Sequence, residues 1–324
     1  MEIFPHIHQI ASMVADRNLY QYLFVGDNTV LLDTGASYTP EEVILPFLKQ
    51  LGIPPSQLTI AINTHADADH HGGNDLLKEA AVEMLLACGD LDRKIIEDSD
   101  LLFASRYDQW IDQHGIGLGL NPEASAWVRK MVGKPRRIDL TFTGGEHISI
   151  DSERNLRVLH VPGHSDGHLA LYDSMNRAVF VGDALHGAYC PNALGEPSLP
   201  PAYYSVAPYL ATLQAVEELP IDWIYSGHWP AFHASKVSDF LTECRQFVEK
   251  ASLLVVKALE SHLDEGVTMQ LCIDECGPLL GTWPEHNRWL LMYPMYGHLV
   301  HLEQQGITSR VENEGKTRWK LKGS

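Results

Sequence analysis

The segment TIAINTHADADHHGGN, residues 59–74, places a dense group of potential metal ligands directly after an apolar run. The run LTIAINT is apolar on both faces, which predicts a buried β-strand. This strand delivers His65 at its C-terminal end, and Asp67, Asp69 and His70 follow immediately. A strand end is rigid, while the turn after it can direct side chains into a cleft. The segment therefore predicts a metal site at one edge of a sheet.

Three later segments repeat this pattern of an apolar strand followed by a possible ligand. They supply His164 in LHVPGHSDGH, Asp183 in VFVGDALH and His228 in IYSGHWP. Small residues such as Gly182 and Gly227 stand beside them and permit sharp turns and close backbone approach. We therefore expect ligands from distant parts of the chain to meet at one site.

The rest of the chain predicts a layered α/β protein with one irregular region. Residues 19–88 alternate β-rich runs with short amphipathic helices, which is typical of layered α/β architecture. Residues 90–135 instead contain long helical segments, such as LDRKIIEDSDLLFASRYDQWIDQ, joined by the Gly-rich HGIGLGLN. We interpret this region as a helical insertion, which either fills space by packing or forms a lid over a cleft.

From about residue 233 the sequence becomes mostly helical. We expect a core domain at 1–235 and a small C-terminal domain at 236–324. The end of the chain reads as the helix HLVHLEQQ followed by a two-stranded wing in SRVENEGKTRWKL. His298 and His301 lie three apart on this helix, and we expect both to be solvated.

The motifs and their order resemble the metallo-β-lactamase superfamily over roughly residues 1–235. The superfamily signature is HxHxDH, followed downstream by His, Asp and His at successive strand ends. Here the signature reads H-A-D-A-D-H, an HxDxDH variant, and the PGHSDGH, FVGDAL and VLLDTG contexts are also similar to the family. The resemblance implies a four-layer αββα sandwich. The tail resembles the winged-helix-like domain of some members, one of which is an endoribonuclease.

Carried over position by position, the resemblance implies two divalent metal ions, with zinc expected first. It assigns the ligands in three sets: His65, Asp67 and His164 for the first ion, Asp69, His70 and His228 for the second, and Asp183 as the bridge between them. A water or hydroxide shared by the two ions would be the nucleophile. As a catalytic residue, Asp69 would also orient that hydroxide.

Asp67 is where the chain departs from the signature, which has histidine at this position. An aspartate ligand is shorter than histidine and adds a negative charge, which shifts the preference of the site toward iron or manganese. The alternative is that Asp67 does not reach the metal, so that the first site is weak or filled with water. Direct ligation and a failed first site are therefore both open.

Other side chains near the motifs are candidates for supporting roles. His186 lies three residues after Asp183, where related lactonases carry a substrate-contacting tyrosine, so the resemblance implies a substrate-contacting or proton-donating role for it. His168 is expected to stabilise the ligand loop by hydrogen bonding, and His71 to point away from the metals. The Pro-rich loop 188–208 forms either a substrate wall or simple loop packing through its aromatic side chains, Tyr189, Tyr203 and Tyr204.

Composition excludes some classes of function. The net charge of -18 disfavours attraction to nucleic acid or to an anionic membrane. No 18-residue apolar run is present, so we expect no transmembrane helix. The N-terminus lacks the features of a signal peptide, and the cysteines are odd in number and scattered. We therefore expect a cytoplasmic protein with reduced, mostly buried thiols.

These observations lead to three hypotheses about function. The first is a metal-dependent hydrolase that acts on a small ester, thioester or lactone through a metal-bridged hydroxide. The second is a phosphodiesterase or endoribonuclease that uses the same dinuclear site. The winged tail supports this second hypothesis. The third is a non-catalytic metal- or ligand-binding protein. A homodimer is possible, because the tail is also a candidate dimerisation module.

Overall fold

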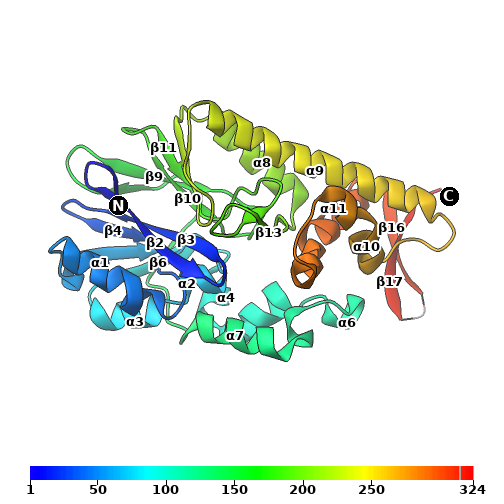
Figure 1. The fold of residues 1–324 in the computed structure, drawn as a ribbon, viewed down its shortest axis with the longest axis horizontal. Coiled ribbons are helices and arrows are strands. Elements are labelled where there is room, and N and C mark those ends of the chain that lie inside the picture. The colour runs from blue at the N-terminus through cyan, green and yellow to red at the C-terminus, as the bar shows by residue number, and fades with distance from the viewer. Residues whose placement is uncertain (314, 324) are drawn as a thin grey trace.

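Two β-sheets pack face to face at the centre of the protein, and helices cover both outer faces (Figure 1). The computed structural model describes residues 1–313 and 315–323. Apolar side chains from both sheets, among them Phe24 and Phe180, fill the space between the sheets. The predicted αββα sandwich is confirmed.

The first sheet has seven strands in chain order, and its C-terminal half is parallel. Its strands are β1 (Glu2–Phe4), β2 (Ile7–Val14), β3 (Arg17–Phe24), β4 (Thr29–Leu32), β5 (Leu58–Ile62), β6 (Leu85–Gly89) and β7 (Leu140–Phe142). The helices that cover its outer face include η1 (Pro40–Ile44), α1 (Leu45–Gln50) and α3 (Asn74–Ala80). The short η2 (Pro55–Gln57) leads into β5. Because β4 and β5 run parallel, their C-terminal ends meet at one edge, where the ligand segment begins.

The second sheet has six strands in the order β15-β14-β11-β10-β9-β8. Its strands are β8 (His147–Ser149), β9 (Asn155–His160), β10 (Leu169–Asp173), β11 (Ala178–Phe180), β14 (Trp223–Tyr225) and β15 (Phe232–His233). Helices α8 (Val206–Glu217) and α9 (Ser235–Ser261) pack on its outer face. A small hairpin, β12 (Cys190–Pro191) with β13 (Pro197–Leu199), lies within the Pro-rich loop.

The helical insertion is more broken than the sequence suggested. It consists of α4 (Arg93–Glu97), α5 (Ser99–Leu102), η3 (Phe103–Tyr107), α6 (Ile111–His114), η4 (Leu118–Leu120) and α7 (Pro122–Val132). The prediction of one long helix through its first half was wrong. Asp98 has an extended backbone and its side chain caps the amides of Asp100 and Leu101, which starts a new helix there. Gly115, with φ of 67°, ends α6 in a left-handed conformation.

The C-terminal region packs closely against the rest of the chain. Its elements are α9, α10 (Met269–Leu280), η5 (Glu285–Leu291), α11 (Met292–Gln304), β16 (Thr308–Asn313) and β17 (Lys316–Leu321). The expected hairpin is present, but its Trp319 is fully buried and stacks on His114 of the insertion, with ring centroids 5.5 Å apart. One continuous apolar cluster joins Val179 of the second sheet to Ile273 and Trp319. The tail therefore packs in the same hydrophobic cluster as the second sheet.

His298 corrects the expectation that both tail histidines are solvated. It is buried between α11 and α9, and the hydroxyls of Tyr203 and Ser252 lie 2.9 Å and 3.1 Å from its two ring nitrogens. The helix turns this residue toward α9, whereas His301 on the same helix is only partly buried. The spacing of the two histidines along the helix did not show which face of α11 packs against α9.

All five cysteines are free and buried. Among the described residues, no helix is both long enough and apolar enough to cross a membrane.

Candidate metal centre and active site

The predicted ligands lie together where strand ends of the two sheets converge. His65 follows β5, and the one-turn helix α2 (Ala68–His71) presents Asp69 and His70 beside it. His164, Asp183 and His228 come from the turns after β9, β11 and β14. Within each of three groups the ligand atoms lie within 4.8 Å of one another: His65, Asp67 and His164; Asp69, His70 and His228; and His65, His70 and Asp183. The groups share His65 and His70, which makes them one cluster.

Backbone carbonyls set the orientation of two of the histidines. Nδ1 of His164 lies 2.5 Å from the carbonyl oxygen of Ala202, and Nδ1 of His228 lies 2.8 Å from that of Asn18. A carbonyl oxygen can only accept a hydrogen bond, so each Nδ1 must carry the proton. Nε2 of each ring is therefore the nitrogen that faces the cluster and that a metal ion would use.

Asp33 sets the orientation of the other two histidines, His65 and His70. Sequence reasoning did not assign it this role. One carboxylate oxygen lies 2.8 Å from Nδ1 of His70, and the hydroxyl of Thr64 donates to the same carboxylate at 2.9 Å. Because that hydroxyl has donated its proton, it accepts from Nδ1 of His65 at 2.9 Å. Asp33 therefore turns Nε2 of both rings toward the site. The signal in the sequence was the VLLDTG context.

Several buried atoms at the centre of the cluster have no hydrogen-bond partner among the described residues. They are Nε2 of His65, Nε2 of His70 and Oδ1 of Asp183. Buried polar atoms are nearly always satisfied, so such a group needs an explanation. Divalent cations bound in the cluster would satisfy these atoms, and imidazole and carboxylate are suitable donors for zinc, iron or manganese. The residues present therefore fit a metal centre.

The carboxylates of Asp69 and Asp183 are ionised in this environment. Burial alone would raise the pKa of Asp69, but the neighbouring His70 and His228 hold it below its usual range. The pKa of Asp183 is likewise held well below normal by the same two histidines, against the effect of burial. Gly227 permits this crowding, because a Cβ there would collide with Oδ1 of Asp183. Both carboxylates are thus anionic donors at neutral pH.

Asp67 reaches the cluster through one of its two oxygens. Its Oδ2 lies 2.9 Å from Nε2 of His164 and 3.5 Å from Nε2 of His65. Its Oδ1 instead accepts two hydrogen bonds from Arg106, a residue of the insertion. Burial would raise the pKa of Asp67, but Arg106 and His164 hold it well below its usual range. Sequence reasoning missed Arg106, because no spacing links it to the motif.

The other candidate histidines lie around this cluster. His168 stacks on His65, and its ring nitrogens contact the carbonyl of Leu169 and the amide of Asp183, so it supports the ligand loop. His71 is buried, which lowers its pKa to about 4. His186 lines the cavity beside the cluster, with Nε2 3.2 Å from Nδ1 of His164. Burial lowers the pKa of His186 to about 3, so its imidazole is neutral.

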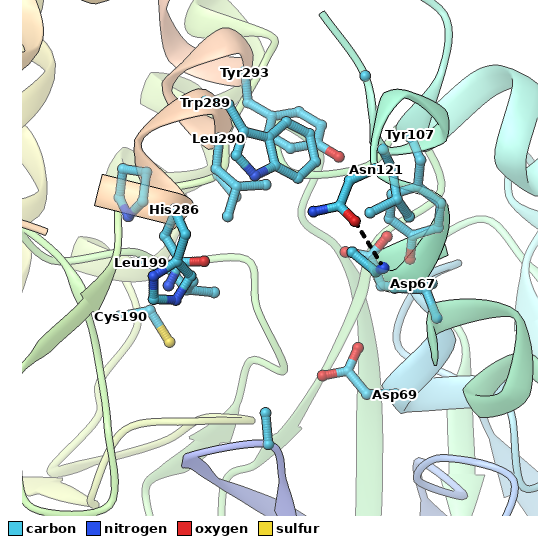
Figure 2. Close-up of a pocket in the computed structure, with 18 of the residues that line it drawn as sticks. Asp67, Asp69, Tyr107, Asn121, Cys190, Leu199, His286, Trp289, Leu290 and Tyr293 are labelled. Carbon is cyan, nitrogen blue, oxygen red and sulfur yellow. Dashed lines mark hydrogen bonds between the residues drawn. The ribbon is translucent and has the colours of Figure 1, made fainter. Parts of the chain in front are cut away.

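A cavity of about 940 Å³ opens from the cluster toward the insertion and the C-terminal region (Figure 2). Asp67 and Asp69 lie on one side of it, and Trp289 and Leu290 of η5 face them from the other side. The insertion contributes further apolar side chains to the wall: Ile116, Leu118, Leu120, Val128 and Met131. The insertion therefore both packs in an apolar cluster and forms part of the cavity wall.

The tyrosines of the Pro-rich loop do not line this cavity. Tyr203 is fully buried and stacks on Tyr209. The loop contributes Cys190, Leu199, Pro200 and Ala202 to the wall instead. The aromatic side chains on the wall come instead from the insertion and the C-terminal region, including Tyr107 and Tyr293. No sequence pattern indicated that residues near 290 would face a site built near residue 65.

Comparison with known proteins agrees with this geometry. The family model of the metallo-beta-lactamase superfamily matches residues 18–228. The chain belongs to the metallo-beta-lactamase superfamily. Its structure is similar to that of a metallo-beta-lactamase family protein from Thermus thermophilus, with a TM-score of 0.74, 18% identity, and coverage of 99% of this chain and 100% of that one. A beta-lactamase domain protein from Burkholderia ambifaria gives a TM-score of 0.73 at 18% identity over 99% and 93% of the two chains. These likenesses concern the fold.

Two curated relatives are similar over part of their length. An acyl-coenzyme A thioesterase MBLAC2 from Gallus gallus is 26% identical over 185 residues, which is 55% of this chain and 59% of the relative. A cytoplasmic hydroxyacylglutathione hydrolase from Arabidopsis thaliana is 24% identical over 213 residues, which is 64% of this chain and 63% of the relative. The chain thus spans less than two thirds of the length of either relative.

Proposed function

We propose that this protein is a metal-dependent hydrolase that cleaves thioesters of apolar acyl groups. The observation that carries the proposal is the position of the His and Asp cluster at the end of one large cavity whose far walls are apolar. A substrate with an apolar body and one reactive carbonyl matches such a cavity. The names of both curated relatives support the thioester, since acyl-coenzyme A and acyl-glutathione are thioesters.

The residues of the cluster would hold two divalent ions. His65, Asp67 and His164 form the set for one ion, Asp69, His70 and His228 form the set for the other, and Asp183 lies between them. Bound there, the ions would polarise the substrate carbonyl and lower the pKa of a water molecule. Asp69 faces the cavity and is ionised, so its free carboxylate oxygen can accept a hydrogen bond from that water and orient it.

The charge of the cavity wall limits which part of a substrate can enter. Among the described residues that line the cavity, Arg17 is the only lysine or arginine, and its Nη1 lies 3.1 Å from the carboxylate of Asp16. Away from the metal ions, a highly charged carrier group such as coenzyme A would find no unpaired lysine or arginine among these lining residues, so we expect it to remain at the mouth of the cavity. The acyl chain would occupy the apolar half, against side chains such as Leu118 and Trp289.

The charge of the lining supports this substrate class over a nucleic acid. The two ions would serve a phosphodiester as well as a thioester, but the further phosphates of a nucleic acid need additional cations. Among the described residues that line the cavity, only Arg17 is a lysine or arginine, and it is paired with Asp16. Basic side chains of the tail hairpin are also engaged within the protein. Arg318 contacts the backbone carbonyl of Gly266, and Lys320 contacts that of Asp264.

A substrate panel on demetallated protein reloaded with zinc, manganese or iron tests the proposal. The panel contains acetyl, butanoyl, hexanoyl and octanoyl thioesters, S-lactoylglutathione, p-nitrophenyl octanoate, a lactone and bis-p-nitrophenyl phosphate. We expect the highest kcat/KM for the longer acyl thioesters, rising by up to about fourfold per added methylene, which corresponds to about 0.8 kcal/mol. Highest turnover on the phosphodiester, or no turnover of any member with any metal, would refute the proposal.

A further inference from the structure

The side chain of Arg106 ties the helical insertion to the departure from the family signature at Asp67. Arg106 lies in η3 and is 2% exposed. Its Nε and Nη2 lie 2.9 Å and 2.7 Å from Oδ1 of Asp67. Both hydrogen bonds therefore hold the same carboxylate oxygen, and Oδ2 is left to face His65 and His164.

The same guanidinium also holds a second predicted ligand. Nη1 of Arg106 donates to the backbone carbonyl of His164 at 2.7 Å, and Nη2 lies 3.3 Å from Nε2 of the same histidine. Arginine can do this because its planar guanidinium presents several N–H groups in a fixed geometry. One side chain thus fixes the relative positions of Asp67 and His164, which lie 97 residues apart.

Arg106 itself is held from two further parts of the chain. Its guanidinium lies over the rings of Tyr204 and Tyr293, 5.3 Å and 6.0 Å from their centroids. The hydroxyl of Tyr293, in α11, also donates to the backbone carbonyl of Arg106 at 2.8 Å. The Pro-rich loop and the C-terminal region therefore brace the residue that contacts the ligands.

The charge balance explains why an arginine accompanies this aspartate. Replacing a neutral imidazole by a carboxylate adds one negative charge to a buried site, and an unpaired buried charge is strongly unfavourable. The positive charge of Arg106 cancels it. The pair of Asp67 and Arg106 then has the same net charge as the histidine that the family signature carries at this position.

We propose that Arg106 is a positioning residue for the first metal ion, which it serves by holding Oδ1 of Asp67, leaving Oδ2 as the single ligating atom, and neutralising the carboxylate. Asp67 and Arg106 act as one unit, so neither can be replaced alone without weakening the first site. In a variant with histidine at position 67, the new imidazole would face the guanidinium without an anion between them.

Metal binding by four variants tests this proposal without reference to catalysis. They are Arg106→Met, Asp67→His, the double variant Asp67→His/Arg106→Met, and the control Arg93→Met. Arg93 also belongs to the insertion, but its side chain is 39% exposed and pairs with Glu97, away from the cluster. Each protein is demetallated and titrated with zinc in competition with a chelator, bound metal is counted by elemental analysis, and thermal melts report folding.

We expect the wild type and the control to bind two ions. Each single variant at position 106 or 67 should bind one ion tightly and the other about 10–100-fold more weakly, the usual effect of losing a group that orients a ligand. The double variant should regain two tight sites. The double variant leaves no unpaired buried carboxylate, so we expect it to fold even if Arg106→Met does not. Its metal content then tests whether Asp67 and Arg106 act as one unit.

Any of three results would overturn the proposal. In the first, Arg106→Met keeps both ions with wild-type affinity. In the second, the double variant fails to regain the second ion. In the third, the wild type binds one ion and Arg106→Met gains another, which would mean that the guanidinium replaces the first metal. Failure of the thioester panel would leave these binding results unchanged, so the two proposals can fail separately.

Discussion

Individual side chains around the ligands decide how well this centre is formed. All four histidines of the predicted ligand set are oriented through Nδ1, two by backbone carbonyls and two through Asp33. Asp33 has φ of 64°, an uncommon conformation for a residue other than glycine. This left-handed backbone ends β4 and carries the carboxylate that Thr64 and His70 contact. The strain is understandable if the carboxylate is needed there.

Replacing Asp33 by asparagine tests this role. The amide side chain could still accept one hydrogen bond, but it would not hold both Thr64 and His70 in their present orientation. We expect Asp33→Asn to weaken metal binding by about 10–100-fold, measured by chelator competition. The matched control is Asp75→Asn, a buried carboxylate in α3 that pairs with Arg136. Equal metal affinities of the two variants would contradict the role of Asp33.

Single residues also show the limits of the sequence. The clustering of the candidate ligands could be predicted because each follows an apolar strand or sits in one short motif. Arg106 could not, because its role depends on a contact across 39 residues with Asp67 and on the irregular helices of the insertion. The orientation of Asp67, with Oδ1 on Arg106 and Oδ2 facing His164, is likewise a consequence of that contact.

Helices outside the sandwich shape the substrate cavity. Trp289 of η5 packs against both the apolar cluster of the insertion and that of the C-terminal region. It also lines the cavity opposite Asp67 (Figure 2). These positions make η5 the element that joins the two outer walls.

We expect Trp289→Ala to reduce kcat/KM for an octanoyl thioester much more than for the acetyl compound. The large indole contributes apolar contact only to the longer chain, so the rise in kcat/KM with chain length should flatten. The measurement is kcat/KM across the acyl series. Trp223→Ala, in β14 and away from the cavity, serves as the control and should keep the wild-type slope. An unchanged slope in Trp289→Ala would place the acyl chain elsewhere.

The packing of α11 on α9 predicts an acid-sensitive stability. Burial lowers the pKa of His298 to about 3 from its ordinary value of 6.5. Between these two pH values the unfolded chain binds a proton that the folded protein excludes, so lowering the pH favours unfolding. The contribution of His298 to stability is fully present above pH 6.5 and is lost as the pH falls toward 3.

The variant His298→Gln removes this titrating group. We expect its free energy of unfolding to be about 1 kcal/mol lower at about pH 8, because its hydrogen bonds to Tyr203 and Ser252 are poorer. Its further loss of stability on acidification should be smaller than that of the wild type. Urea denaturation at a series of pH values measures both. Parallel pH profiles of the two proteins would mean that His298 does not contribute.

The protein as a whole should depend on metal for stability. The centre joins strand ends of both sheets, and three of its buried atoms lack partners among the described residues. A metal that binds only the folded protein stabilises it, by about 2.7 kcal/mol per ion at a free concentration about 100-fold above its Kd. We expect the melting temperature to rise when metal is added to demetallated protein and to fall again with a chelator. Asp183→Ala should show a much smaller rise, and identical melts with metal and with chelator would count against a metal centre.

The sequence by itself determined the sandwich and the group of side chains that meet at the strand ends, because both rest on local patterns. Apolar runs predict the strands, and the order of ligand segments at their ends predicts which side chains meet. It also indicated the hairpin near the C-terminus, through β-rich runs on either side of a turn.

Only the tertiary structure decided how the outer elements serve the site. The insertion and the C-terminal region approach the ligand cluster from distant parts of the chain. Their apolar residues form the same sequence pattern whether they pack in a core or line a cavity. The packing places Trp289 opposite Asp69 and brings Arg106 to Asp67. Asp67 is therefore a paired carboxylate whose neutralising partner is set by packing across the molecule, which no local pattern encodes.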